Sequence, residues 1–241
     1  MSIFAGPKIV EEGLVLYLDA ANQKSYPGTG TTWNDLNLLT NNSTLTNGVT
    51  FSSNNKNVFD FDGTNDVVIL PNTTYWNTNV FGTATNFTIS VWAKFDSYFN
   101  WTCLFHKSGG AFYSSGEGAS IWVNADGFQA VYSSGEDGNP SGGSVIISYA
   151  TSNITSWFNI VFTGDGTTGK LYVNGNLHSS SALSGRSRSV VTSSNTAKIG
   201  TRGAGTGYFN GLLNLPMLYT RGLTAQEVKQ NFEATRGRYS I

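Results

Sequence analysis

Residues 157–177 read WFNIVFTGDGTTGKLYVNGNL, and this stretch carries the clearest structural signal in the chain. Apolar residues occupy every second position of 158–162, and the run 170–173 (KLYV) alternates in the same way. A period of two is typical of strands that bury one face. Asn174-Gly175 follows, a pair that readily adopts the positive φ angles of a type I′ turn. The stretch therefore predicts two strands around a Gly-rich turn, followed by an Asn-Gly hairpin turn.

The composition favours a packed β protein. Of 241 residues, 12% are charged and 13% are aromatic, and Gly, Ser, Thr and Asn are abundant. Low charge combined with many aromatic and β-branched residues is the opposite of the balance found in disordered chains. The length is ordinary for one β sandwich, and the sequence shows no repeat and no linker. We expect an N-terminal arm over residues 1–13 and one domain over 14–241.

The charge and cysteine content argue against several classes of protein. A net charge of −1 creates no field that would gather nucleic acid or an anionic membrane. Cys103 is the only cysteine, so the chain forms no internal disulfide. No apolar run has the roughly 18–20 residues needed to cross a bilayer. The start, MSIFAGPKIVEE, lacks the features of a signal peptide. We therefore expect no nucleic-acid partner, no membrane insertion and no secretion through a signal peptide.

Further strands are predicted on both sides of the hairpin by alternation and turn residues. They are expected at 14–18, 58–70 (two strands around a turn at 62–66), 87–95, 104–107, 121–123, 128–132, 145–149, 198–200 and 211–219. The Asn- and Thr-rich segment 23–57 fits either short strands with turns or a long surface loop. One helix is expected, because Thr224 and Glu227 have the spacing of a capping box, and Val228 and Phe232 would form its buried side.

Six segments in order resemble one known family. They are LVLYLDA (14–20), WNDL (33–36), FDGTND (61–66), FTISVW (87–92), the hairpin 157–177, and YTRGLT (219–224). Together they resemble the laminin-G-like (concanavalin A-like lectin/glucanase) jelly roll. The resemblance implies an all-β, two-sheet antiparallel jelly-roll sandwich, here with one short C-terminal helix.

A second and narrower resemblance rests mainly on residues 11–36. The pieces EGLVLYLDAAN and SYPGTGTTWNDL are similar to structural proteins of tailed bacteriophages. This resemblance implies a particle-surface protein, such as a capsid decoration, head fibre or tail-fibre component, assembled in the host cytoplasm. Its partners would be other virion proteins, further copies of itself and host-surface glycans.

Catalysis finds little support in the sequence. A retaining glycosidase needs two carboxyl groups about 5–5.5 Å apart. The glucanase pattern E-x-D-x-x-E is absent, and only Asp60 and Asp62 have a suitable spacing on a strand. Glu117 and Glu136 both lie in Gly- and Ser-rich stretches, which predicts that they are in loops. There is no G-x-S-x-G elbow, and Cys103 fits a buried small hydrophobe better than a nucleophile. We therefore expect that this protein is not an enzyme.

Calcium and carbohydrate are the two ligands that the residues suggest. Asp62, Asn65 and Asp66 offer hard oxygen ligands in one turn, although such side chains also cap their own turns. The resembled family usually has acidic residues where this chain reads LLNLP (212–216), which weakens the case for calcium. Glycan binding needs flat aromatic faces and polar groups. The candidates, which could instead be ordinary core residues, are Trp101, Tyr113, Trp122, Asn124, Asp126 and Tyr132.

The sequence thus predicts a non-enzymatic phage surface protein with a glycan-adhesion role. Two alternatives stay open: a glucanase-like enzyme on the same fold, and a purely structural virion protein without a ligand.

Overall fold

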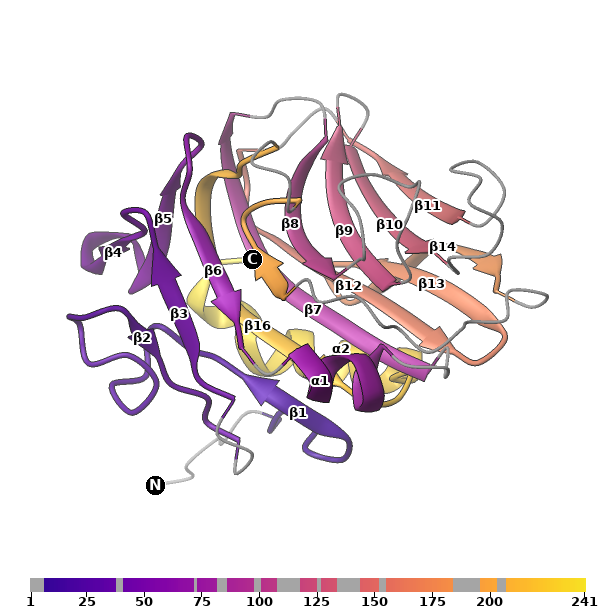
Figure 1. Cartoon of the computed structure of the whole chain (residues 1–241). Helices are drawn as coiled ribbons and strands as arrows, with labels where there is room; N and C mark the ends of the chain where they lie inside the picture. The colour runs from indigo at the N-terminus through magenta and orange to yellow at the C-terminus, as the bar shows by residue number, and fades with distance from the viewer. Residues whose placement is uncertain are drawn as a thin grey trace, which may run out of the picture.

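The structure, a computed structural model, describes residues 7–37, 41–71, 73–81, 86–97, 101–107, 118–124, 127–133, 144–151, 155–183, 196–202 and 207–241. Over these residues the chain forms two antiparallel sheets of eight strands each, with a helix, α2 (Ala225–Thr235), behind one of them (Figure 1). This arrangement confirms the predicted jelly-roll sandwich.

One sheet, sheet A, contains the hairpin and the last long strand. Its order is β14 (Asn176–Ala182), β13 (Thr168–Val173), β12 (Phe158–Asp165), β7 (Asn86–Ser97), β16 (Asn210–Tyr219), β5 (Val58–Asp62) and β4 (Thr50–Ser52). The eighth strand, β1 (Leu14–Tyr17), pairs with β16.

The other sheet, sheet B, combines short N-terminal strands with four strands from residues 102–150 and one short strand after them. Its order is β11 (Ser144–Ala150), β10 (Gly127–Ser133), β9 (Gly118–Asn124), β8 (Thr102–Lys107), β15 (Ala197–Ile199), β6 (Val67–Leu70), β3 (Ser43–Thr46) and β2 (Thr32–Trp33). The segment 23–57 therefore forms short strands, with a 3₁₀ turn η1 (Ser53–Asn55) before β5.

The predicted hairpin is confirmed. In β12 and β13, Ile160 pairs with Val173 and Phe162 with Leu171. Asn174 and Gly175 both have positive φ, 51° and 74°. Gly175 is required for a second reason, because a Cβ atom there would lie 2.9 Å from the Phe232 side chain of α2.

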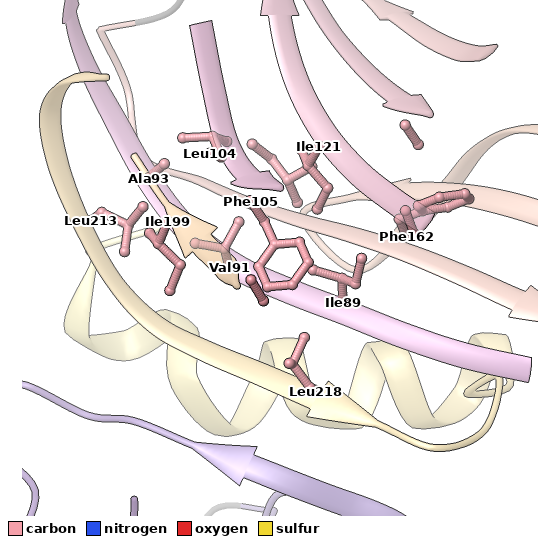
Figure 2. Close-up of a cluster of buried hydrophobic side chains, with 14 of the residues drawn as sticks. Ile89, Val91, Ala93, Leu104, Phe105, Ile121, Phe162, Ile199, Leu213 and Leu218 are labelled. Carbon is pink, nitrogen blue, oxygen red and sulfur yellow. The ribbon is translucent and has the colours of Figure 1, made fainter. Parts of the chain in front are cut away.

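The main core lies between the sheets and follows the predicted alternation. Ile89, Val91 and Ala93 of β7 point into it, where they meet Leu104, Phe105 and Ile121 of sheet B, as Figure 2 shows. The intervening Trp92 of β7 belongs to a second cluster on the outer face of sheet A. Strand periodicity in the sequence thus assigns residues 87–95 of β7 to the correct faces.

The helix α2 covers the outer face of sheet A. Its capping box is formed as predicted: the Glu227 N–H donates to Thr224 Oγ1, and the Thr224 N–H donates to Glu227 Oε2 at 2.8 Å. Val228 and Phe232 are buried against the sheet. The Trp92 indole N–H donates to Thr235 Oγ1 at 3.1 Å. A 3₁₀ turn, η3 (Arg236–Arg238), then leads to Tyr239.

One helical segment was not predicted. A single turn, α1 (Thr73–Tyr75), continues into a π-helical turn, η2 (Trp76–Val80). Trp76 is fully buried and its indole N–H donates to the carbonyl of Pro71. Burial of this aromatic side chain, which depends on the tertiary structure, decides the local conformation. Among the described residues, no helix is long and apolar enough to cross a membrane.

Candidate functional site

The two outer faces of the sandwich differ. On sheet A, α2 and the N-terminal residues around Val10 bury the outward side chains in two apolar clusters. On sheet B, no described helix lies against the outer face. The outward side chains of sheet B are therefore where the described part of the fold offers a surface for a ligand.

Strand register defines this surface, which we call the open face. One row crosses all eight strands through Thr32, Thr44, Ile69, Lys198, His106, Ser120, Val131 and Ile146. A second row contains Cys103, Trp122, Gln129 and Ser148. These residues alternate along their strands with members of the main core, so they point away from it.

Two tryptophans form the aromatic centre of the open face. The Trp101 and Trp122 rings meet edge-on, with centroids 5.8 Å apart and an interplanar angle of 86°. Trp122 is only 2% exposed, whereas Trp101 is 37% exposed. Trp101 therefore covers Trp122 and presents its own ring to solvent. Both residues were predicted as glycan-stacking candidates, and the structure brings them into contact.

The backbone of Trp101 has an unusual conformation. Its φ angle is +71°, which is rare for a bulky residue and costs of order 1–3 kcal/mol. Gly207 packs against it so closely that a Cβ atom at 207 would lie 2.4 Å from the Trp101 carbonyl oxygen. The Cys103 N–H also donates to the Gly207 carbonyl at 3.1 Å. Backbone contacts thus hold the one solvent-exposed indole of the described open face in a fixed position.

Polar groups surround the tryptophans. His106 Nδ1 lies 3.0 Å from Ser120 Oγ, and the imidazole contacts the Trp122 ring at a centroid distance of 6.4 Å. Gln129 Nε2 donates to Ser148 Oγ at 3.4 Å. Gln129 is half-buried and Ser148 is exposed. Hydroxyl, amide and imidazole groups therefore flank the aromatic centre.

The remaining predicted glycan residues have different outcomes. Asn124 lies at the half-buried end of β9, at the edge of the open face. Tyr132 is fully buried in the main core, where its ring stacks on Phe87. The prediction that Tyr132 offers a stacking face is therefore wrong, because β10 turns this side chain inward. Tyr113 and Asp126 lie outside the described residues.

Sequence reasoning missed several members of the open face. Ser148, Gln129, His106 and Lys198 come from four different strands, and only the pairing register places them beside the tryptophans. The signal available in the sequence was the alternation of polar and apolar residues within 144–150 and 127–133. That alternation shows which side chains share a face, but not which strands are neighbours.

The described strands of the open face bring no pair of carboxyl groups together. The eight strands of sheet B, as the structure bounds them, contain no Asp and no Glu. Cys103 is fully buried, and burial raises the pKa of its thiol well above the ordinary value. Lys107 is also buried, which lowers its pKa to about 8. Glu117 and Glu136 lie outside the described residues.

Asp60 and Asp62 lie on β5 of sheet A, away from the open face. Burial raises the pKa of Asp60, and the charges of Asp96 and Asp62 act in the same direction. Within the described residues, the pair with glycosidase-like sequence spacing is thus separated from the aromatic centre by the whole sandwich.

In the predicted calcium turn, some of the candidate ligand oxygens are already hydrogen-bonded and one is not. Asp66 is 2% exposed; its Oδ2 accepts the Asp62 N–H at 3.0 Å, and its Oδ1 is buried with no hydrogen-bond partner among the described residues. Burial raises the pKa of Asp66. Asp62 Oδ1 accepts the Thr64 N–H at 2.8 Å, and Asn65 is exposed. The orphaned oxygen fits a cation, while Asp62 already caps its own turn.

Asn214 occupies the region of β16 where the resembled family usually has acidic residues. Its Oδ1 accepts the Ala20 N–H at 2.9 Å, and its Nδ2 donates to the Asn57 carbonyl at 3.4 Å. Asn214 is buried and links three chain segments. Among the described residues, no group of three or more His, Cys, Asp or Glu is placed to hold a metal ion.

Comparison with solved structures finds the same fold in several carbohydrate-related proteins. Domain 4 of AbnA, a GH43 extracellular arabinanase from Geobacillus stearothermophilus in complex with arabinotriose, matches with a TM-score of 0.66 and 14% identity, over 93% of this chain and 100% of that one. The binding domain of botulinum neurotoxin DC in complex with SialylT matches with a TM-score of 0.65 and 13% identity, over 91% of this chain and 51% of that one. Trypanosoma rangeli sialidase in complex with the inhibitor DANA matches with a TM-score of 0.61 and 16% identity, over 96% of this chain and 35% of that one.

At these identities the likeness shows the fold alone. The chain spans about half the length of the neurotoxin binding domain and all of AbnA domain 4. No curated protein matches by sequence.

A family model gives the stronger result. It is described as the concanavalin A-like lectin/glucanases superfamily, and it matches residues 62–229, well over half of the chain. The match spans most of both sheets, including the hairpin, the open face from β6 to β11 and the first turn of α2. The jelly-roll topology agrees with it. The chain therefore belongs to the concanavalin A-like lectin/glucanases superfamily.

Proposed function

We propose that this protein is a non-catalytic carbohydrate-binding domain that holds a glycan on the open face of sheet B. The observation that carries the proposal is Trp101, an indole that is 37% exposed and fixed over Trp122 by a strained backbone. A residue held at a costly φ angle suggests a function for its position.

The chemistry of the open face suits a sugar. The C–H faces of a pyranose ring pack on a flat aromatic surface, and Trp101 provides one. Hydroxyl groups need donors and acceptors nearby, which Gln129 and Ser148 supply from the adjacent strands. The absence of Asp and Glu from the eight strands of sheet B favours binding over hydrolysis.

The comparisons support the same class of ligand. The AbnA domain was solved with arabinotriose and the neurotoxin domain with SialylT, and both share this fold. The sialidase match keeps an enzymatic role as the alternative. An active site would need carboxylates from outside the described strands of sheet B, such as Glu117 and Glu136.

We further propose that the domain is displayed on a tailed-phage particle as a decoration, head-fibre or tail-fibre module. This part rests only on the resemblance of residues 11–36. Mass spectrometry of purified particles from the source culture tests it: the protein should be present at a fixed copy number, and its absence from intact particles would contradict the proposal.

The test of glycan binding is an array measurement on the purified protein. Wild type should bind a defined set of glycans, and Trp101→Ala should lose that binding. Leu177→Ala is the matched control, since Leu177 is 52% exposed on β14 of the other sheet and should bind like wild type. Incubation with the same glycans should release no shorter sugars. A blank array would contradict glycan binding, and release of products would contradict the non-catalytic role.

A further inference from the structure

One cavity has neither Trp101 nor Trp122 among its described lining residues. It is a groove of about 770 Å³ between the N-terminal residues 7–11, β1, the segment 22–37 and the C-terminal end of α2. None of its lining residues belongs to a strand of sheet B. Its volume is in the range of about 300–1,000 Å³ that small-molecule sites occupy.

The walls of this groove are held by hydrogen bonds between distant segments. On the helix side, the Val10 N–H donates to Asn231 Oδ1 at 2.8 Å, and Gln230 Nε2 donates to the Lys8 carbonyl at 2.8 Å. On the other side, the Leu36 N–H donates to the Tyr17 carbonyl at 2.9 Å. These hydrogen bonds hold the described walls of the groove together.

Charge around the groove is uneven. Lys8 and Lys24 line it from different walls, are exposed, and have no ion-pair partner among the described residues. Arg238 is neutralised by the buried Asp19 at 2.6 Å. Among the described lining residues, Glu11 is the one carboxylate. Two unpaired ammonium groups thus face a cavity in a chain whose net charge is −1.

Other lining groups limit the kind of anion. The groove also contains the Tyr17 side chain and the apolar Leu14 and Leu36, which can pack against the C–H face of a sugar ring. The helix end in the lining, at Ala234 and Thr235, is a C-terminus, whose partial negative charge disfavours anions, and a compact dianion such as phosphate more than a singly charged carboxylate. Arg238, the residue best suited to hold a phosphate, is already bound to Asp19.

We propose that this groove is a binding site for an acidic sugar, with its carboxylate held by Lys8 and Lys24 and its ring against Tyr17. Glu11 accepts hydrogen bonds from sugar hydroxyls. The site is independent of the glycan bound on the open face.

Titration calorimetry with galacturonic acid and N-acetylneuraminic acid tests this site, with galactose as the neutral comparison. Both acids should bind and galactose should not. Lys8→Gln and Lys24→Gln should each weaken binding about three- to fivefold, as expected for exposed charge pairs. Lys229→Gln is the control, because Lys229 lies on α2 outside the lining and pairs with Glu233. Binding should weaken in 0.5 M salt, since exposed charges are screened over about 3–10 Å.

The two sites can be separated by exchanging variants. Trp101→Ala should leave binding of the acidic sugars unchanged, and Lys24→Gln should leave the glycan-array profile unchanged. Failure of both acids to bind, or equal loss in Lys229→Gln, would overturn the proposal. Binding of inorganic phosphate or a tetraglutamate peptide as tightly as the sugars would also overturn it, by identifying a general anion site.

Discussion

The Trp101 indole lies edge-on over the Trp122 indole, with ring centroids 5.8 Å apart, so one tryptophan shields the other from solvent. Trp122 is 2% exposed and contributes to the packing of the open face, while Trp101 is 37% exposed and available to a ligand. Two residues of one type, in contact, therefore have separable roles.

Substitution of the two tryptophans should separate stability from binding. Trp122→Ala should lower the free energy of unfolding by about 3 kcal/mol or more, because it removes a large buried side chain. Trp101→Gly should change it by no more than about 1 kcal/mol, since glycine relieves the positive φ angle while the exposed ring is lost. Urea unfolding measures both values. A larger loss in Trp101→Gly than in Trp122→Ala would contradict these roles.

Tyr239, near the C-terminus, should stabilise the whole domain by packing against the outer face of sheet A. Tyr239 stacks on Trp92 with centroids 4.0 Å apart and also contacts Trp157 at 4.5 Å. We expect Tyr239→Ala to cost about 3 kcal/mol of unfolding free energy. Ile241→Ala, at a position 38% exposed two residues later, should change it little. Equal urea midpoints for the two variants would show that the aromatic cluster is not required.

Acid should weaken the attachment of α2 through Glu227. The Arg221 guanidinium, bonded to this carboxylate at 2.6 Å and 2.9 Å, lowers the pKa of Glu227 to about 2. A carboxyl whose pKa is depressed on folding adds stability above its unfolded pKa, about 4.3, and loses it as the pH falls toward 2.

Glu227→Gln should therefore be about 1–2 kcal/mol less stable than wild type at pH 7, after allowance for solvent exposure, and about a quarter of that difference should remain at pH 2.5. Thermal unfolding at the two pH values measures this difference. Glu12→Gln is the control, because the Glu12 carboxylate is 87% exposed and 3.9 Å from Arg221. The same deficit at both pH values would mean that the ion pair is not its cause.

Calcium should stabilise the protein if the orphaned Asp66 oxygen is a cation ligand. At a calcium concentration about 100 times Kd, the stabilisation would be about 2.7 kcal/mol, which corresponds to a rise in Tm of several degrees. Asp66→Asn should abolish the rise, and Asp165→Asn, which alters a carboxylate paired with Lys170 on another turn, should keep it. Identical wild-type melting curves in calcium and in chelator would rule out the site.

Periodicity and turn chemistry in the sequence predict most of the fold. The faces of β7, the Asn174-Gly175 turn and the Thr224–Glu227 capping box are all local features, and each is confirmed. The π-helical turn at 76–80 was not predicted, because it depends on the burial of Trp76 by residues distant in sequence.

The candidate site was only partly predictable. Aromatic richness pointed to Trp101 and Trp122, yet the same signal included Tyr132, whose ring lies in the core. Composition does not distinguish an aromatic side chain that points into the core from one that points to solvent. The alternation of side chains along β10 and its register with β9 make that distinction. The groove beside Tyr17 was invisible to sequence patterns, since its walls come from both ends of the chain.

The most direct test is calorimetric titration of wild type, Trp101→Gly and Trp101→Phe with the strongest glycan from the array. If the open face binds sugar through the Trp101 ring, Trp101→Gly should lose affinity by about tenfold or more, as expected for a stacked aromatic contact. Trp101→Phe should retain part of it. Unchanged affinity in Trp101→Gly, in a protein that unfolds at the same urea concentration as wild type, would contradict the account.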